Sequence, residues 1–436
     1  MKKTTALVFA SAVFAASAAV PVIDSSSVSV KQGGGKTVVI EYTMNPATEG
    51  DTEPAIVTVD ILTNAVGETA ASVGGEHLWT LTGDVNRVVC HTADFKHKIL
   101  WYPHREGMGE WTLPAAQVTA RVTLWSTNAP PAYWVVDIDG INDRSNDRYY
   151  PDAAQVPGTV TNDTYKIDKF VFRHVPASGV TWRQGASKDD CSSATDKETR
   201  RYVTFSYDWY MGIYPVTRAQ HAKMVGNGFS SYTGFGSTGP TEADFTSILP
   251  LTGTPVKFQF NGIDNAKDGF PTNGRFRVLT QDYYLKRFRN YAKIAVDLPT
   301  QAEYEYTCRA GSTNLWVCGD GDIGDYAWYS GNAEEMIHGV GLKLPNDWGF
   351  YDIQGNVWEF CLDRHDSNAR TSDPVWDPLG PYYLSDGGGT TTSSYRRMYG
   401  GNYTSDKTAM RASSYGTVAP ATNTSEHGFR LVVLMP

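Results

Sequence analysis

The sequence predicts two domains of different class, an all-β domain followed by a larger, turn-rich α+β domain. The 436 residues are about three times the common domain size, so more than one domain is expected. The first part alternates apolar and polar residues with a period of two, which is typical of half-buried strands. The second part combines short helix-start signals with many glycines and aromatic residues. Because charged residues make up only 19% of the chain, a fold packed around aromatic side chains is favoured over a helical bundle.

The N-terminus has the pattern of a secretory signal peptide. Lys2 and Lys3 precede an apolar run from Ala6 to Ala16, and small residues follow it. We therefore expect residues 1–19 to be removed and the protein to be exported to the periplasm, the cell surface or the medium. The alternative is a membrane anchor, but a span needs about 20 apolar residues and this run is shorter. No later segment is apolar enough, so no membrane span is expected after signal removal.

Residues 25–128 are predicted to form a β-sandwich of immunoglobulin or fibronectin type. Runs of β-branched and aromatic residues are separated by clusters of Gly, Pro, Asn and Asp, which supply turns. The clearest runs lie at 37–42, 55–61, 97–101 and 118–125. The cysteine and tryptophan spacing of antibody domains is missing, so only the architecture is predicted. Residues 129–163, which begin near Pro130 and are rich in Asp, Asn and Arg, are expected to be a linker.

Polar capping residues mark the starts of helices in the second domain, residues 164–436. Thr217 with Gln220, and Thr300 with Glu303, have the spacing of capping boxes, in which side chains satisfy backbone N–H groups at a helix start. The predicted helices extend to about Val225 after Thr217, from Gln281 to about Ile294 after Thr280, and from Ala302 to Arg309 after Thr300.

The cysteine count is interpreted in the light of export. Five cysteines are an odd set, so at least one thiol is free or pairs with another chain. Cys308 and Cys318 are predicted to form a disulfide, because they flank a short turn at 311–314 and an oxidising compartment permits the bond. No C-x-x-C motif occurs, so neither a zinc ribbon nor a thioredoxin-type centre is supported. The formal net charge of -9 also disfavours nucleic acid as the main partner.

Several blocks of the second domain occur in the order found in a known family. The blocks are 211–217, 298–311, 346–360, 400–403 and 428–431. Together they closely resemble the signature blocks of the sulfatase-modifying-factor family, which includes formylglycine-generating enzymes. The resemblance implies a C-type-lectin-like fold for this domain, with a small antiparallel sheet and long ordered loops.

The resemblance also implies a copper site, from which this sequence departs. Formylglycine-generating enzymes bind copper through two cysteines between the Gly-Gly block and the final Gly-Phe-Arg. Here residues 402–411 contain no cysteine, and no thiol follows Cys361. Copper(I) requires soft thiolate ligands, so copper is not expected. Iron is not expected either, because ergothioneine-type members bind it with histidines supplied largely by a helical domain, and a β-rich domain precedes here.

Three residues are candidates for a rearranged catalytic centre, namely Cys361, His365 and His427. Their spacing matches no metal-ligand signature. The alternative is that each residue has an ordinary structural role, with the histidines satisfied by hydrogen bonds.

A calcium loop is the one ion site of the family that the sequence retains. Asp352 and Glu359 would supply carboxylates, and Gly355 and Val357 would supply main-chain carbonyls, in keeping with the preference of calcium for oxygen ligands. A second ion site would fall near Asn332. The alternative is that Asp352 and Glu359 only cap turns.

Two classes of function follow from this sequence. The first is a ligand-binding or display protein, which would present loops 363–392 and 402–427 to a protein or glycan. Its contact residues are expected to include Asn402, Tyr403, Ser405 and Tyr415. The composition of the second loop is compatible with a diversified binding surface and equally with an ordinary ordered loop. The second class is a metal-dependent oxidoreductase of the formylglycine-generating or ergothioneine-synthesising type with a rearranged site.

Overall fold

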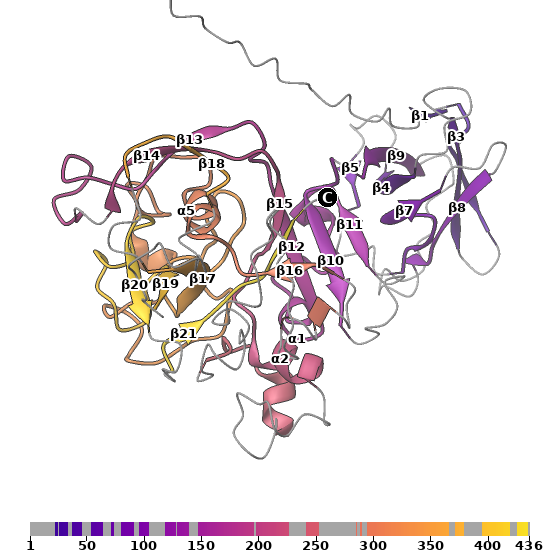
Figure 1. Cartoon of the computed structure of the whole chain (residues 1–436). Helices are drawn as coiled ribbons and strands as arrows, with labels where there is room; N and C mark the ends of the chain where they lie inside the picture. The colour runs from indigo at the N-terminus through magenta and orange to yellow at the C-terminus, as the bar shows by residue number, and fades with distance from the viewer. Residues whose placement is uncertain are drawn as a thin grey trace, which may run out of the picture. The chain divides into compact units, whose positions relative to one another are not determined.

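The computed structural model divides the chain into two compact units (Figure 1). Unit 1 comprises residues 1–72 and 80–130, and unit 2 comprises residues 73–79 and 131–436. The described residues are 22–24, 26–33, 37–45, 54–63, 71–73, 80–90, 96–103, 118–127, 129–138, 147–195, 198–225, 241–252, 285, 288–289, 294–365, 371–378, 395–418 and 425–434. The predicted signal peptide lies outside them and remains a prediction. Within the described residues, no helix is long and apolar enough to cross a membrane.

Unit 1 is built from two antiparallel sheets, as the period-two runs predicted. The first sheet contains β1 (Val22–Ile23), β2 (Ser29–Gln32), β3 (Val38–Asn45), β6 (Thr82–Gly83) and β8 (Lys96–Trp101). The second contains β4 (Ala55–Thr63), β5 (Ala71–Ser72), β7 (Arg87–Val89) and β9 (Val118–Ser126). Alternate residues of β3, such as Ile40 and Tyr42, are buried, which confirms the alternation expected of half-buried strands.

The largest sheet of unit 2 is antiparallel and begins in the segment that was predicted to be a linker. Its order is β11 (Arg148–Tyr150), β10 (Tyr133–Asp137), β12 (Lys169–Val175), β15 (Trp209–Gly212), β22 (Val432–Leu434) and β16 (Val296–Asp297). The linker prediction for residues 129–163 is therefore wrong. The apolar run Tyr133–Val136 is buried and pairs with β12, whereas the polar composition that follows it in the sequence suggested a connector.

Two smaller sheets flank the helix α5 (Gln301–Arg309), as Figure 1 shows. The three-stranded sheet contains β13 (Thr181–Gln184), β14 (Arg201–Thr204) and β18 (Val375–Trp376). The four-stranded sheet contains β20 (Tyr415–Val418), β19 (Arg396–Tyr399), β17 (Trp358–Arg364) and β21 (His427–Gly428). Unit 2 thus consists mostly of strands with few helices among its described residues.

The predicted capping boxes are confirmed at two helices. In α2 (Arg218–Val225) the Thr217 N–H donates to the Gln220 side chain at 3.0 Å, and the Gln220 N–H donates back at 3.1 Å. The same reciprocal bonds join Thr300 and Glu303 at the start of α5. Most of the helix predicted after Thr280 lies outside the described residues. In the part of the chain that the structure describes, the other helices are α1 (Thr164–Ile167), η6 (Ala153–Gln155), η9 (Glu242–Thr246) and η10 (Ile323–Asp325).

Candidate functional site: a polar pocket and the sealed interior behind it

Strand β17 (Trp358–Arg364) carries two of the residues that the sequence singled out, Glu359 and Cys361, and its two faces have different surroundings. Phe360 packs in one hydrophobic cluster and Cys361 in another, as expected when successive side chains of a strand point to opposite sides. His427 lies on β21, beside Trp358, and its ring is 5.6 Å from that of Phe360. His427 and Cys361 therefore face opposite sides of the sheet.

The three candidate catalytic residues do not form one centre. Cys361 is fully buried, and burial together with the nearby carboxylate of Asp363 raises the pKa of its thiol well above the usual range. Burial also lowers the pKa of His427 to about 4, so this ring is neutral at pH 7. His365 lies beyond the end of β17 and its ring is 6.0 Å from that of Tyr415. The described residues include no group of three or more metal-ligating side chains.

Glu359 is held by an arginine at the centre of the domain. The Arg430 Nε–H and Nη2–H donate to the two carboxylate oxygens at 2.7 and 2.6 Å, and both side chains are fully buried. The Tyr304 hydroxyl donates to the same carboxylate at 3.1 Å. Burial disfavours the charged guanidinium, but the adjacent carboxylate more than offsets this and holds the pKa of Arg430 above its ordinary value.

The expected calcium loop is stabilised by its own hydrogen bonds. Asp352 accepts one bond from the Gly341 N–H at 2.7 Å and one from the Asn356 amide at 3.3 Å. Gly355 has a φ of 82°, and an added Cβ would lie 2.4 Å from the Trp328 carbonyl oxygen, so only glycine fits this turn. Burial raises the pKa of Asp352 to about 6.

The ligand set predicted for calcium does not fit the geometry. Both oxygens of Glu359 accept hydrogen bonds from Arg430, so the carboxylate is already paired with a positive charge. Val357 is buried, and its N–H donates to the Gly355 carbonyl. Asn332, expected at the second ion site, accepts from the Tyr329 N–H and donates to the Gly324 and Ala327 carbonyls, so its side chain closes a turn.

The predicted disulfide is wrong, because Cys308 and Cys318 are both free thiols. Cys308 points into the main core from the last turn of α5, whereas Cys318 packs in a separate cluster with Ile323 and Met410. The intervening turn is closed instead by Arg309, whose Nη1–H donates to the carbonyls of Thr313 and Asn314 at 2.9 and 3.0 Å.

The residues expected to contact a ligand are mainly part of the interior. Asn402 and Tyr403 are buried. The Ser405 hydroxyl donates to the Asn402 side chain at 2.6 Å, and its carbonyl accepts from the Ser330 N–H, so both residues stabilise a turn. Tyr415 is half-buried, with the Arg397 guanidinium 4.2 Å from its ring centre. These side chains do not form an exposed contact surface.

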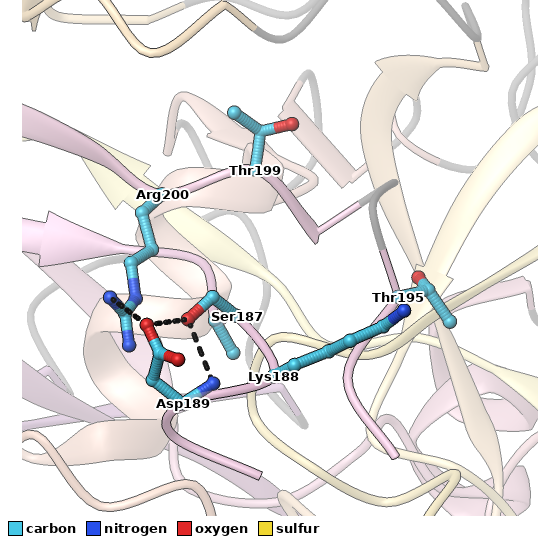
Figure 2. Close-up of a pocket in the computed structure, with 7 residues that line it drawn as sticks. Ser187, Lys188, Asp189, Thr195, Thr199 and Arg200 are labelled. Atoms are coloured by element: carbon cyan, nitrogen blue, oxygen red, sulfur yellow. Dashed lines mark hydrogen bonds and ion pairs between the residues drawn. The ribbon is translucent and has the colours of Figure 1, made fainter. Parts of the chain in front are cut away.

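A polar pocket of about 400 Å³ opens in the connection between β13 and β14. It is lined by Ala186, Ser187, Lys188, Asp189, Thr195, Thr199 and Arg200. Figure 2 shows Arg200, Asp189 and Ser187 joined by polar interactions, while Lys188 extends away from this group. Sequence reasoning missed this pocket, because its residues belong to no motif and come together only when the hairpin folds.

The charges of the pocket are partly compensated. Arg200 donates to both oxygens of Asp190 at 2.7 and 2.6 Å, and Arg183 donates to the same carboxylate at 3.0 Å. Asp189 lies 3.7 Å from Arg200 and its side chain is 89% exposed. Among the described residues Lys188 has no hydrogen-bond or ion-pair partner, so the pocket retains one free cation.

A buried ion pair joins the pocket loop to the C-terminal segment. The Arg411 Nη2–H donates to Glu198 at 2.6 Å, and the Ser413 hydroxyl donates to the other oxygen of Glu198 at 2.5 Å. Arg411 also donates to the Ser193 hydroxyl at 2.8 Å. Hydrogen bonds from Arg411, more than 200 positions away in the sequence, thus hold the pocket loop at Ser193 and Glu198.

Comparisons with known proteins agree with the resemblance found in the sequence. Residues 175–435 match the family described as sulfatase-modifying factor enzyme 1-like domain. Chaperone protein LppX of Paenibacillus barcinonensis is 28% identical over 237 residues, which cover 48% of this chain and 77% of that protein. The formylglycine-generating enzyme of Mus musculus is 30% identical over 150 residues, covering 30% of this chain and 38% of the enzyme. The solved structure of Treponema denticola variable protein 1 is 21% identical to this chain in sequence. The match covers 62% of this chain and 96% of that protein, with a TM-score of 0.44.

Proposed function

Because the chain belongs to the sulfatase-modifying factor enzyme 1-like family, we propose that it is an exported member with a binding role instead of formylglycine-generating activity. The observation that carries this proposal is the contrast between a sealed interior and an open pocket. In the described interior, Glu359 is paired with Arg430 and Cys361 is buried. The pocket between β13 and β14, by comparison, is open and lined by polar side chains.

The chemistry of copper supports a binding role. An oxidase of this family would need two thiolates between the Gly-Gly block and Gly-Phe-Arg, and residues 402–411 contain no cysteine. Cys361 does not substitute for them, since burial keeps its thiol protonated. The second hypothesis is an oxidoreductase with a rearranged centre at Cys361, His365 or His427. It is less well supported, because Cys361 and His427 face opposite sides of the sheet and His365 lies beyond the end of β17.

The ligand in this proposal is a protein or glycan outside the cytoplasm. The signal-peptide pattern of residues 1–19 supports export. The relative from Paenibacillus is named a chaperone protein, so one similar protein carries a name unrelated to formylglycine. We also propose a C-type-lectin-like fold for unit 2 and an immunoglobulin- or fibronectin-like sandwich for unit 1. The two antiparallel sheets of unit 1 support the second assignment, and the small mixed sheets of unit 2, each with one parallel pair of strands, support the first. Calcium has no role in the proposal, because Glu359 is engaged by Arg430.

Metal analysis and oxygen uptake test the proposal directly. The purified full chain, incubated with copper(II) or iron(II) and a cysteine-containing peptide, should consume no oxygen above the metal alone and should leave the peptide thiol unchanged. A Cys361→Ser variant is the matched control and should behave identically. Oxygen uptake by the wild type that the variant lacks would overturn the binding proposal and establish the oxidoreductase hypothesis.

A further inference from the structure

The three-stranded sheet of unit 2 exposes two large aromatic side chains on one face. Trp376 of β18 is 68% exposed and Tyr202 of β14 is 56% exposed. Single exposed apolar residues are normal on a protein surface, so these two rings are notable because they belong to neighbouring strands of one sheet. Both residues are amphipathic, with a flat apolar ring and a polar N–H or O–H.

The strand register places these two rings on the same face. Thr204 pairs with both Thr181 and Trp376, and side chains of paired residues lie on the same side of a sheet. Tyr202 is two positions before Thr204 and so shares that side. The opposite face carries Trp182 and Val203, which are buried in the main core. The exposed side therefore presents two aromatic rings, while the hydroxyls of Thr181 and Thr204 on this side bond to each other at 2.8 Å.

The short strand β18 is fixed in position by its neighbours. Its two residues pair in parallel with β14, and the following residue, Asp377, accepts bonds from the Ser206 N–H at 2.7 Å and the Ser206 hydroxyl at 2.6 Å. The Asp377 N–H donates to the Thr204 carbonyl. Because the backbone on both sides of the ring is bonded, Trp376 is held in place before any ligand arrives, which lowers the entropic cost of binding.

The aromatic face is continuous with the polar pocket. Arg183 pairs with Tyr202 in the sheet register, and its guanidinium contacts Asp190. The same carboxylate is held by Arg200, which lines the pocket. Among the described residues this surface has three cations, Lys188, Arg183 and Arg200, and three carboxylates, Asp189, Asp190 and Asp377. The two arginines contact Asp190, whereas Lys188 has no partner among these residues.

We propose that this surface binds a polysaccharide that carries carboxylate groups. The C–H faces of the sugar rings stack on Trp376 and Tyr202, and a carboxylate of the chain enters the pocket and pairs with Lys188. The serine and threonine hydroxyls that line the pocket match the hydroxyls of a sugar. The proposal rests on the binding role proposed above and names the class of ligand.

The composition of the surface favours a sugar chain over a protein. The centre of a protein interface is mostly apolar and desolvated. Here the aromatic rings are surrounded by hydroxyls and charges, and the pocket lining contains Ser187, Thr195 and Thr199. The one cation without a partner among the described residues, Lys188, matches a chain that carries a single carboxylate on each sugar or disaccharide unit. A densely sulfated chain would require more cations than Asp189 and Asp190 leave uncompensated.

Affinity electrophoresis of the full chain tests the proposal with defined polymers. Polygalacturonate, alginate and hyaluronate in the gel should retard the protein, at least one of them strongly, and added salt should weaken the effect. Neutral dextran, dextran sulfate and the acidic protein serum albumin should retard it less. Trp376→Ala and Tyr202→Ala should each weaken binding about tenfold, and Trp376→Phe, which keeps a flat ring, should restore most of it.

Matched variants separate the two parts of the surface. Lys188→Gln should weaken binding and reduce its salt dependence, while Tyr395→Ala, which removes an exposed tyrosine elsewhere in unit 2, should change nothing. Equal retardation by neutral dextran, or stronger retardation by dextran sulfate or albumin, would overturn the proposal. Failure of all three carboxylated polymers would also overturn it. The binding role itself is tested by the oxygen-uptake experiment, and the ligand class is tested by electrophoresis. A failure of the second with no oxygen uptake in the first would therefore reject the ligand class and leave the binding role.

Discussion

Two arginine–carboxylate pairs in unit 2 have the same geometry and opposite surroundings. In both pairs, Glu359 with Arg430 and Asp190 with Arg200, the Nε–H and one Nη2–H donate to the two carboxylate oxygens at 2.7 and 2.6 Å. The side chains of the first pair are 0% exposed, whereas those of Arg200 and Asp190 are 31% and 16% exposed. Hydrogen-bond geometry alone therefore does not decide what such a pair does.

The difference in burial decides whether each pair stabilises the fold or can take part in binding. In the interior, each charge depends on its partner, because water is absent and an unpaired ion is costly. At the pocket, water screens the pair, and the surface can exchange one partner for a ligand at small cost. The buried pair fixes the domain, and the exposed pair leaves the pocket adaptable.

The largest effect is expected when the buried pair is broken. Glu359→Gln removes the negative charge and leaves Arg430 uncompensated, so the free energy of unfolding should fall by about 3–5 kcal/mol in chemical denaturation. The loss should be the same in calcium and in chelator, because the carboxylate binds Arg430 instead of a metal. A loss that is clearly larger in calcium would show that Glu359 ligates the ion after all.

A smaller effect is expected from protonation of the buried histidine. Burial lowers the pKa of His427 to about 4, so the unfolded chain takes up its proton at higher pH than the folded one. The free energy of unfolding should therefore fall by about 2 kcal/mol as the pH falls from about 6.5 to about 4, because the neutral ring stabilises the folded state only above this range.

The His427→Gln variant isolates this contribution. Its free energy of unfolding should depend less on pH in that window than that of the wild type. Asp352, whose pKa is raised to about 6, acts in the opposite direction in both proteins and cancels in the difference. Identical slopes in the two proteins would contradict a buried, neutral His427.

Local signals in the sequence predicted much of the fold, but not the pairings between distant residues. The capping boxes at Thr217 and Thr300 depend on residues three positions apart, so they are visible in the sequence. The partner of Glu359 is 71 positions away, and that of Glu198 is 213 positions away. Such pairs become visible only when the strands are placed, which is why Glu359 was assigned to calcium and the pocket was missed.

The disulfide prediction failed for a related reason. Cys308 and Cys318 flank a short turn, and proximity in sequence suggested a bond. The direction of each side chain is set by the elements that carry it, however, and α5 directs Cys308 into the core. The guanidinium of Arg309 closes the turn instead, and no local sequence pattern predicts this role.

Two thiols, Cys191 near the pocket and Cys361 in the interior, differ in the same way as the two ion pairs. Burial alone would raise the pKa of Cys191, but its contact with Ser193 and the charge of Arg411 hold the pKa below the usual value. Cys191 is half-buried beside the pocket loop, whereas Cys361 is fully buried. Because Cys90 is also exposed, modification must be followed at each site by peptide mapping. A thiol reagent at pH 7 should modify Cys191 several-fold faster than Cys361. Comparable rates for Cys361 in the native protein would contradict its sealed position.

The smallest effect on stability is expected when the exposed pair, Asp190 with Arg200, is broken. Asp190→Asn removes the carboxylate that Arg200 and Arg183 share, yet the free energy of unfolding should fall by less than about 1 kcal/mol, because both guanidinium groups reach water. The net charge of the binding surface would then rise by one. If the surface takes a carboxylated chain, Asp190→Asn should strengthen binding to polygalacturonate and increase its salt dependence. A loss of stability as large as that of Glu359→Gln would mean that the pocket pair is structural, and the contrast between the two regions would disappear.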